Sequence, residues 1–201
     1  MEHILAHLSQ DKILAGIIKN QKIDIAHEVH SPYDALVGSV ISQQISTKAA
    51  DAIYKRFIEL FPGGKPEPHL IISLPEEAMR AAGLSFQKAK YLKNIATFFL
   101  DEKLLYHDWD MKSDEEIVSL LTQIKGVGVW TVQMILMFSL DREDVFPYKD
   151  FGIQTAMREA YKLDGEGRQF EAKMITIAQN WSPYRTYASK YLWKWKDTTD
   201  R

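Results

Sequence analysis

Cysteine is absent from this chain of 201 residues. Its absence excludes disulfide bonds, cysteine-ligated zinc and an iron–sulfur cluster, and it agrees with a reducing compartment. Long hydrophobic runs are missing too, since no apolar stretch approaches the roughly 20 residues of a membrane span. The segment Met1–Leu8 lacks the basic start and the apolar centre of a signal peptide. We therefore expect a cytoplasmic protein without a membrane partner.

The chain also lacks an excess of positive charge, because its formal net charge is −2. Proteins that coat nucleic acid nonspecifically are usually basic, so the charge argues mildly against that class. The net charge does not exclude a local basic face. For any single lysine, the simpler interpretation is a solvated charge on a helix. The candidates for the face are Lys88, Lys90, Lys93, Arg185, Lys190, Lys194 and Lys196.

What the chain does contain is helical periodicity almost throughout. Apolar residues recur at helical spacing from Ala35 to Ile58, and a Pro- and Gly-rich loop at 62–68 ends that run. The capping-box spacing Ser-x-x-Glu occurs at 73–76 and 113–116, and each predicts a helix start. No segment alternates with the period of a strand. The sequence predicts an all-α protein, as one compact domain or as two lobes sharing a cleft.

The most informative stretch is a glycine hairpin between two apolar helices. One helix runs into Lys125, Gly126, Val127 and Gly128, and a second helix begins at once. The first amides of a helix have no partner within it, so they form an anion site next to the glycines. Trp130 follows two residues later, where an aromatic ring can face an extruded base. The simpler alternative is an ordinary corner between two helices.

Asp150 is the candidate catalytic acid. It follows Gly128 by 22 residues and precedes a helix predicted at 151–161. Aspartate is a preferred N-cap, and on the sequence alone this structural role is the stronger interpretation. The two roles are compatible, because a helix N-terminus favours the ionised carboxylate, which can stabilise a developing cation or orient a water. The nearby acids Asp141, Glu143 and Asp144 are interpreted as solvated.

Two further features complete the set of candidates. Gln43 and Gln44 lie within an otherwise apolar helical run, either as helix-terminal polar contacts or as probes into a duplex, and the sequence favours neither. Among the tryptophans, Trp181 is expected in the core. No arrangement of acids and histidines has the spacing of a metal site.

In order and spacing, these pieces resemble the helix-hairpin-helix superfamily of DNA glycosylases. Within it the chain looks like the 3-methyladenine DNA glycosylase II type, in a short form without the N-terminal β-domain. The resemblance runs from about Ser31 to Trp195. The matching pieces are Ser42–Ser46, Gly83–Ser85 with Lys88 and Ala89, Lys125–Thr131, Asp144–Pro147 with Asp150, and Trp181–Arg185 with Tyr191–Trp193.

The resemblance implies a role for each candidate. Asp150 matches the essential aspartate that stabilises the oxocarbenium-like sugar and helps to position the attacking water. The hairpin residues Lys125, Gly126, Val127 and Gly128 would grip a DNA phosphate, with a monovalent cation on the hairpin carbonyls in many relatives. Trp130 and Trp193 match aromatics of the base pocket. Met134 would also belong to this pocket and affect which base it prefers. Gln43 and Gln44 lie where relatives insert a wedge into the duplex.

Expectations about fold and activity follow from the same resemblance. Residues 31–138 would form a helical barrel lobe carrying the hairpin at 120–140, and residues 1–30 with 139–201 would form a second helical lobe, with double-stranded DNA in the cleft. The activity would be hydrolysis of the N-glycosidic bond of alkylated purines in base excision repair, by a monomer without a cofactor. Relatives with lyase activity carry a lysine where this chain has Trp130, so a monofunctional enzyme is expected.

Three alternatives remain at this point. The chain could be a non-enzymatic helix-hairpin-helix module that only grips DNA backbone. It could be a glycosylase for a different damaged base. It could also be a helical scaffold for protein interactions, which would show no salt-sensitive DNA binding.

Overall fold

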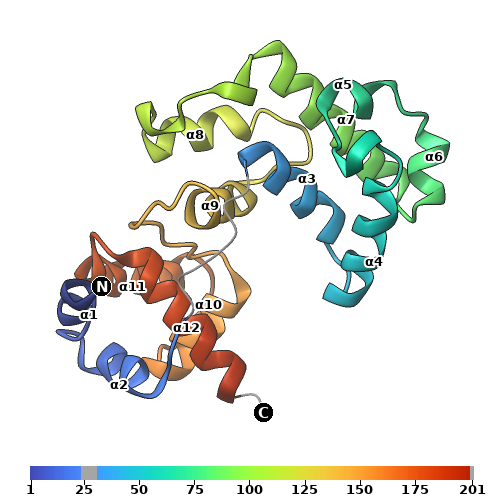
Figure 1. Cartoon of the computed structure of the whole chain (residues 1–201). Helices are drawn as coiled ribbons and strands as arrows, with labels where there is room; N and C mark the ends of the chain where they lie inside the picture. Colours follow the sequence, from blue (N-terminus) through green and yellow to red (C-terminus); the bar gives the residue numbers. More distant parts are fainter. Residues whose placement is uncertain (24–30, 200–201) are drawn as a thin grey trace. The chain divides into compact units, whose positions relative to one another are not determined.

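The computed structural model describes residues 1–23 and 31–199, and within these ranges the regular structure is helical, with no β-strand (Figure 1). The all-α fold predicted from the sequence is confirmed. The chain folds as two compact units, one of Met1–Glu28 with Leu136–Arg201 and one of Val29–Ile135. The sequence placed the corresponding boundaries at 30/31 and 138/139, and the two-lobe assignment built on them stays a prediction.

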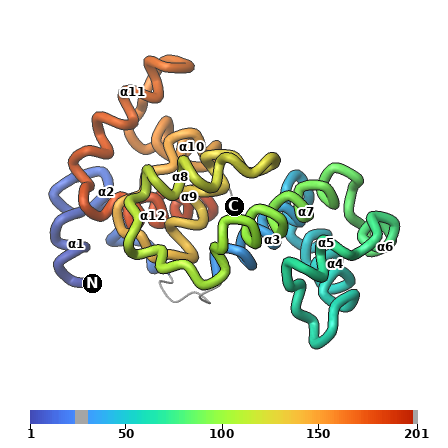
Figure 2. The backbone as a smooth tube through the Cα atoms, turned by 90° about the horizontal axis from the view of Figure 1, so that it is seen from above, coloured from blue at the N-terminus to red at the C-terminus, as the bar shows by residue number. Residues whose placement is uncertain are grey.

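The unit Val29–Ile135 is organised around one long helix, α7 (Phe86–Asp101), which packs against α3 (Pro32–Ser42), α5 (Pro68–Ser73) and α6 (Glu76–Ala81), as Figure 2 shows. The buried face of α7 carries Leu92, Ile95 and Phe99. Its other helices are α4 (Thr47–Ile58), α8 (Asp114–Leu121) and the start of α9 (Val129–Phe138), with short 3₁₀ turns at Pro62–Gly64, Leu104–Tyr106 and Trp109–Met111. The exposed face of α7 is therefore left available for polar side chains.

The other unit joins the two ends of the chain. Helices α1 (Glu2–Leu8) and α2 (Lys12–Asn20) pack together, and α12 (Arg185–Thr199) packs on α2 and α10 (Phe151–Ala160). α11 (Gly167–Ala178) leads into a 3₁₀ turn at Gln179–Trp181. Trp181 has no exposed surface, as expected for a core residue. Its indole N–H donates to Asp11, the N-cap of α2, and this bond ties the first helices to the last.

Two local predictions were wrong. The run from Ala35 to Ile58 is two helices, because the chain turns between α3 and α4 with Gln44 at a φ of 59°. Ser46 then caps α4 through the amide of Ala49. The first capping box does not form either: Ser73 ends α5, where its hydroxyl donates to the carbonyl of Leu70. The second box, at 113–116, is present as predicted.

No helix in ranges 1–23 and 31–199 is both long and apolar enough to cross a membrane.

Candidate functional site

The hairpin is a tight connection whose geometry depends on one glycine. α8 ends at Leu121, four residues before the predicted end at Lys125, and α9 begins at Val129. Gly126 has a φ of 106°, and a side chain there would overlap the ring of Tyr91. Glycine is required at this position both by the backbone conformation and by the close approach of Tyr91.

The start of α9 is buried on one side and exposed on the other. Val127 and Val132 are buried, whereas Val129 and Trp130 are 49% and 43% exposed. The amide of Val132 donates to the carbonyl of Gly128 at 3.1 Å, which begins the helical pattern. The opening turn of α9 thus presents backbone N–H groups beside the glycines, as the predicted phosphate site requires. Phosphate binding stays a prediction.

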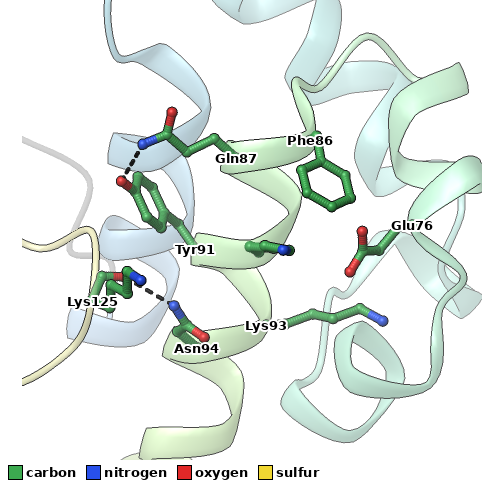
Figure 3. A pocket seen from close by; sticks show the side chains of 8 residues that line it. Glu76, Phe86, Gln87, Tyr91, Lys93, Asn94 and Lys125 are labelled. Atoms are coloured by element: carbon green, nitrogen blue, oxygen red, sulfur yellow. Dashed lines mark hydrogen bonds between the residues drawn. The ribbon is translucent and has the colours of Figure 1, made fainter.

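Helix α7 supports the hairpin through side-chain contacts, which the sequence did not suggest. The Asn94 side chain donates to the carbonyl of Lys125 at 3.2 Å, and the Gln87 amide donates to the hydroxyl of Tyr91, whose ring lies against Gly126 (Figure 3). The contacts of Asn94 with Lys125 and of Tyr91 with Gly126 join residues far apart in the sequence, so no local pattern could have revealed them. A cation on the hairpin carbonyls stays a prediction.

The two candidate wedge residues lie in the turn after α3. Gln43 is the C-cap of α3, and the neighbouring Gln44 is exposed in the left-handed conformation. Lys88 donates from Nζ to the carbonyls of Ile41 and Gln43, at 2.9 and 2.8 Å. Burial lowers the pKa of Lys88. The interpretation of Lys88 as a solvated charge was therefore wrong, since it satisfies the end of α3 and fixes the turn.

Asp150 caps α10, as predicted. Its Oδ1 accepts a hydrogen bond from the amide of Ile153 at 2.9 Å. The same oxygen accepts a second hydrogen bond, at 2.7 Å, from the indole Nε1 of Trp193 on α12. The turn that delivers Asp150 is held by the buried side chains of Val145 and Phe146. The carboxylate is thus positioned by its own helix and by a partner 43 residues away.

Trp193 packs within a small aromatic cluster. Its ring stacks on Phe138 with centroids 6.1 Å apart and an interplanar angle of 27°. Gly152 leaves the space for it, because a Cβ there would lie 3.1 Å from both Trp193 Cδ1 and Asp150 Oδ1.

The ammonium group of Lys190 lies 5.0 Å from the Phe138 ring centroid, and burial lowers the pKa of Lys190. Lys190 is thus half-buried rather than solvated. Phe138 and Gly152 were not predicted from the sequence, although a glycine as the second residue of α10 is a signal of close packing.

Of the three acids interpreted as solvated, Asp144 is not. Its carboxylate accepts two hydrogen bonds from the guanidinium of Arg185, at 2.7 and 2.8 Å, and one from the hydroxyl of Ser182 at 2.8 Å. Partial burial acts to raise the pKa of Asp144, but the bonds from Arg185 and Ser182 outweigh it and hold the pKa below the usual value. The pair fixes the start of α12, the helix that carries Trp193.

The site residues fall into two groups, one in each unit. Asp150 and Trp193 are in direct contact in the unit of the two termini. The hairpin, the wedge residues, Trp130 and Met134 belong to the unit 29–135, in which Met134 is half-buried. That the two groups share one base pocket stays a prediction. In the described parts of the chain, no three or more His, Asp or Glu residues gather as a metal site.

Comparison with known proteins matches this arrangement to one superfamily. The sequence profile of the HhH-GPD superfamily of base excision DNA repair proteins matches residues 37–183. DNA-3-methyladenine glycosylase 1 of Schizosaccharomyces pombe is 36% identical over 193 residues, covering 94% of this chain and 83% of the relative.

Solved structures of two glycosylases are also similar to this chain. A 3-methyladenine DNA glycosylase of the same yeast, in complex with abasic DNA, has a TM-score of 0.78 at 35% identity and covers 96% of this chain and 95% of that one. A DNA-3-methyladenine glycosidase from Bacillus halodurans has a TM-score of 0.85 at 32% identity, covering 96% of this chain and 88% of that one. This chain therefore belongs to the HhH-GPD superfamily of base excision DNA repair proteins.

Proposed function

We propose that this protein is a monofunctional DNA glycosylase of the 3-methyladenine DNA glycosylase II type, which removes alkylated purines from double-stranded DNA. The observation that carries the proposal is the placement of Asp150, whose Oδ1 is held by the amide of Ile153 and by the indole of Trp193. Membership in a superfamily of DNA repair proteins supports it, and so do the names of the two similar glycosylases.

The reaction needs electrostatic stabilisation more than acid catalysis. An alkylated purine carries a positive charge, so it is a good leaving group when the bond from C1′ of the sugar to the base nitrogen breaks. The bonding electrons leave with the base, which becomes neutral, and positive charge develops on the sugar. Asp150 stabilises that charge. A water molecule then forms the new bond to C1′ and releases its proton, with Asp150 orienting it.

Selection of the base would come from flipping and from aromatic stacking. A damaged base leaves the duplex more readily than a normal one. A cationic purine stacks well on electron-rich rings, a role for Trp193 and Trp130, with Met134 shaping the pocket. Gln43 and Gln44 would fill the gap left in the duplex, while the hairpin at Lys125–Gly128 holds a backbone phosphate.

The product would be an intact abasic site. A lyase needs an amine nucleophile that attacks the sugar carbon, and tryptophan at position 130 cannot form a Schiff base. We also propose that the protein works as a monomer without a cofactor, apart from a monovalent cation at the hairpin. It would act wherever the genome lies, on the nucleoid of a bacterium or in a nucleus.

The test is release of free bases from methylated duplex DNA by the wild type and by Asp150→Asn. Asparagine is as good an N-cap as aspartate, so this change removes the charge and keeps the cap. Wild-type release of methylpurines, strand breaks only after alkali, and loss of release in the variant would support a monofunctional alkylbase glycosylase and the role of Asp150.

Asp11→Asn is a matched control, because Asp11 also caps a helix and also accepts a hydrogen bond from a tryptophan indole, that of Trp181. It should keep base release at temperatures where the variant is folded. Equal release by wild type and Asp150→Asn would refute the role of Asp150. Duplex binding without release of any base would favour the DNA-binding module or a different lesion, and no binding would favour the scaffold.

A further inference from the structure

A groove beside the hairpin carries three lysines. It has a volume of about 610 Å³, lies wholly within the unit 29–135, and is lined by residues of α7 together with Glu76 and Lys125. We call it the lysine groove, after Lys90, Lys93 and Lys125. Figure 3 labels Lys93 and Lys125 in it. The proposed role of the hairpin does not account for Lys90 and Lys93, which lie on α7 and not in the hairpin.

The groove lies on the solvent side of an amphipathic helix. Ala89, Leu92, Ile95 and Phe99 are buried on one face of α7. The groove residues follow on the other face, namely Phe86, Gln87, Lys90, Tyr91, Lys93 and Asn94. Three lysines against one glutamate make the lining positive overall, in a chain whose net charge is negative. A positive groove on an acidic protein is a local feature that calls for an anionic partner.

The groove is physically continuous with the hairpin. Lys125 belongs to both, and its carbonyl accepts a hydrogen bond from Asn94, another residue that lines the groove. Tyr91, another lining residue, packs its ring against Gly126. The groove therefore directly adjoins the hairpin. From Phe86 to Asn94 the helix rises by about 12 Å, the axial length of about three to four nucleotides of one DNA strand.

The side chains suit a phosphate backbone better than a base. The ammonium of Lys90 lies 4.2 Å from the ring centroid of Phe86, which keeps it at the groove wall while the ring itself is 52% exposed. Lysine acts as a point charge and makes no bidentate reading of base edges. Such contacts position a duplex without selecting its sequence.

We propose that the lysine groove binds backbone phosphates of the DNA strand next to the phosphate held by the hairpin, using Lys90 and Lys93. This inference rests on the proposed function as a DNA glycosylase. It assigns to α7 a part of the DNA-binding surface beyond the hairpin, and it explains how an acidic protein gains affinity for duplex DNA.

The experiment measures the affinity of the full chain for a labelled duplex containing an abasic-site analogue, over a range of salt concentrations. Each lysine–phosphate contact contributes about 1 to the slope of log K against log salt, so Lys90→Gln/Lys93→Gln should flatten the slope by about 2. Base release at limiting protein should fall together with the affinity, because the proposal places both lysines in contact with the substrate strand.

Lys65→Gln/Lys103→Gln is the matched control: it removes the same charge from exposed positions of the same unit that do not line the groove. It should change the slope by less than about 0.5. Glu76→Gln removes the only negative charge of the groove lining and should act in the opposite direction, tightening binding.

Equal slopes for the two double variants would overturn the proposal. It would also be overturned if the groove variant bound DNA like the wild type but lost affinity for a polyglutamate peptide, since the groove would then take an acidic polypeptide. If the wild type bound no duplex at all, the proposed function would fail and the groove proposal with it, an outcome distinct from the other two.

Discussion

The indole Nε1 of Trp193 donates a 2.7 Å hydrogen bond to Oδ1 of Asp150, the same oxygen that accepts the amide of Ile153 at the start of α10. One carboxylate oxygen therefore accepts hydrogen bonds from two helices, α10 and α12. This contact links the candidate acid to the candidate pocket aromatic within one unit of the chain, and it predicts a positioning role for Trp193 in addition to the proposed stacking role.

Trp193→Phe tests the positioning role, because it keeps an aromatic ring and removes the N–H donor. Hydrogen bonds to charged groups contribute about 1.5 to 3 kcal/mol, so the rate of base release should fall by about ten- to hundredfold. Single-turnover release from methylated duplex measures this, alongside affinity for an abasic duplex, which should change little. A wild-type rate in Trp193→Phe would show that the hydrogen bond has no part in catalysis.

Gly152→Ala should weaken the same hydrogen bond between Trp193 and Asp150 by steric crowding. A Cβ at this position lies 3.1 Å from Asp150 Oδ1 and from Trp193 Cδ1, so these two side chains must shift away from it by a few tenths of an ångström. Alanine favours the helix by about 1 kcal/mol, so the protein should stay folded while base release falls severalfold. Gly16→Ala in α2 is the control, because no atom lies within 4 Å of its Cβ, and it should leave the rate unchanged.

Substitutions of the two hairpin glycines should affect different properties. Gly126→Ala should lower stability, and Gly128→Ala should weaken DNA binding. Gly126→Ala places a side chain at a φ of 106° and against the ring of Tyr91, so it should lower the free energy of unfolding by about 2 kcal/mol or more. At Gly128 a Cβ meets nothing within 4 Å. Gly128→Ala should thus change stability by less than about 0.5 kcal/mol, yet weaken duplex binding because the methyl group blocks close approach of a phosphate. Denaturant titration and DNA affinity together check both variants, and identical behaviour would contradict the assignment.

Asp144→Asn should destabilise the protein in a pH-dependent way. The pKa of Asp144 is lower in the folded protein than the value of about 3.9 expected for an unfolded chain. The native state therefore binds fewer protons, and the stabilisation is fully present above pH 4 and is lost as the pH falls through the lower, folded value. Loss of the charged pair with Arg185 should cost about 1 to 3 kcal/mol at pH 7. Unfolding of both proteins from pH 7 to pH 2 measures it, and a difference that did not shrink in acid would contradict the prediction.

Much of the local structure was readable from residue type and spacing. The capping box at 113–116, the N-cap role of Asp150 and the burial of Trp181 were all predicted, because each depends on a residue's own chemistry or on partners within one turn. The break between α3 and α4 was missed, since Gln44 in the left-handed conformation carries no compositional signal. Ser73 failed as a cap because the preceding residues already formed a short helix.

Contacts between residues distant in the sequence set the remaining features. Trp193 reaches Asp150 across 43 residues, Lys88 reaches the carbonyl of Ile41 across 47, and Asn94 reaches the hairpin carbonyl of Lys125 across 31. A periodic pattern specifies which face of a helix is buried, but it says nothing about which helix covers that face. The helices, their caps and the identity of the candidate acid thus follow from the chain's local chemistry. The partner of that acid, the support of the hairpin and the lysine groove follow from how the helices pack within each unit.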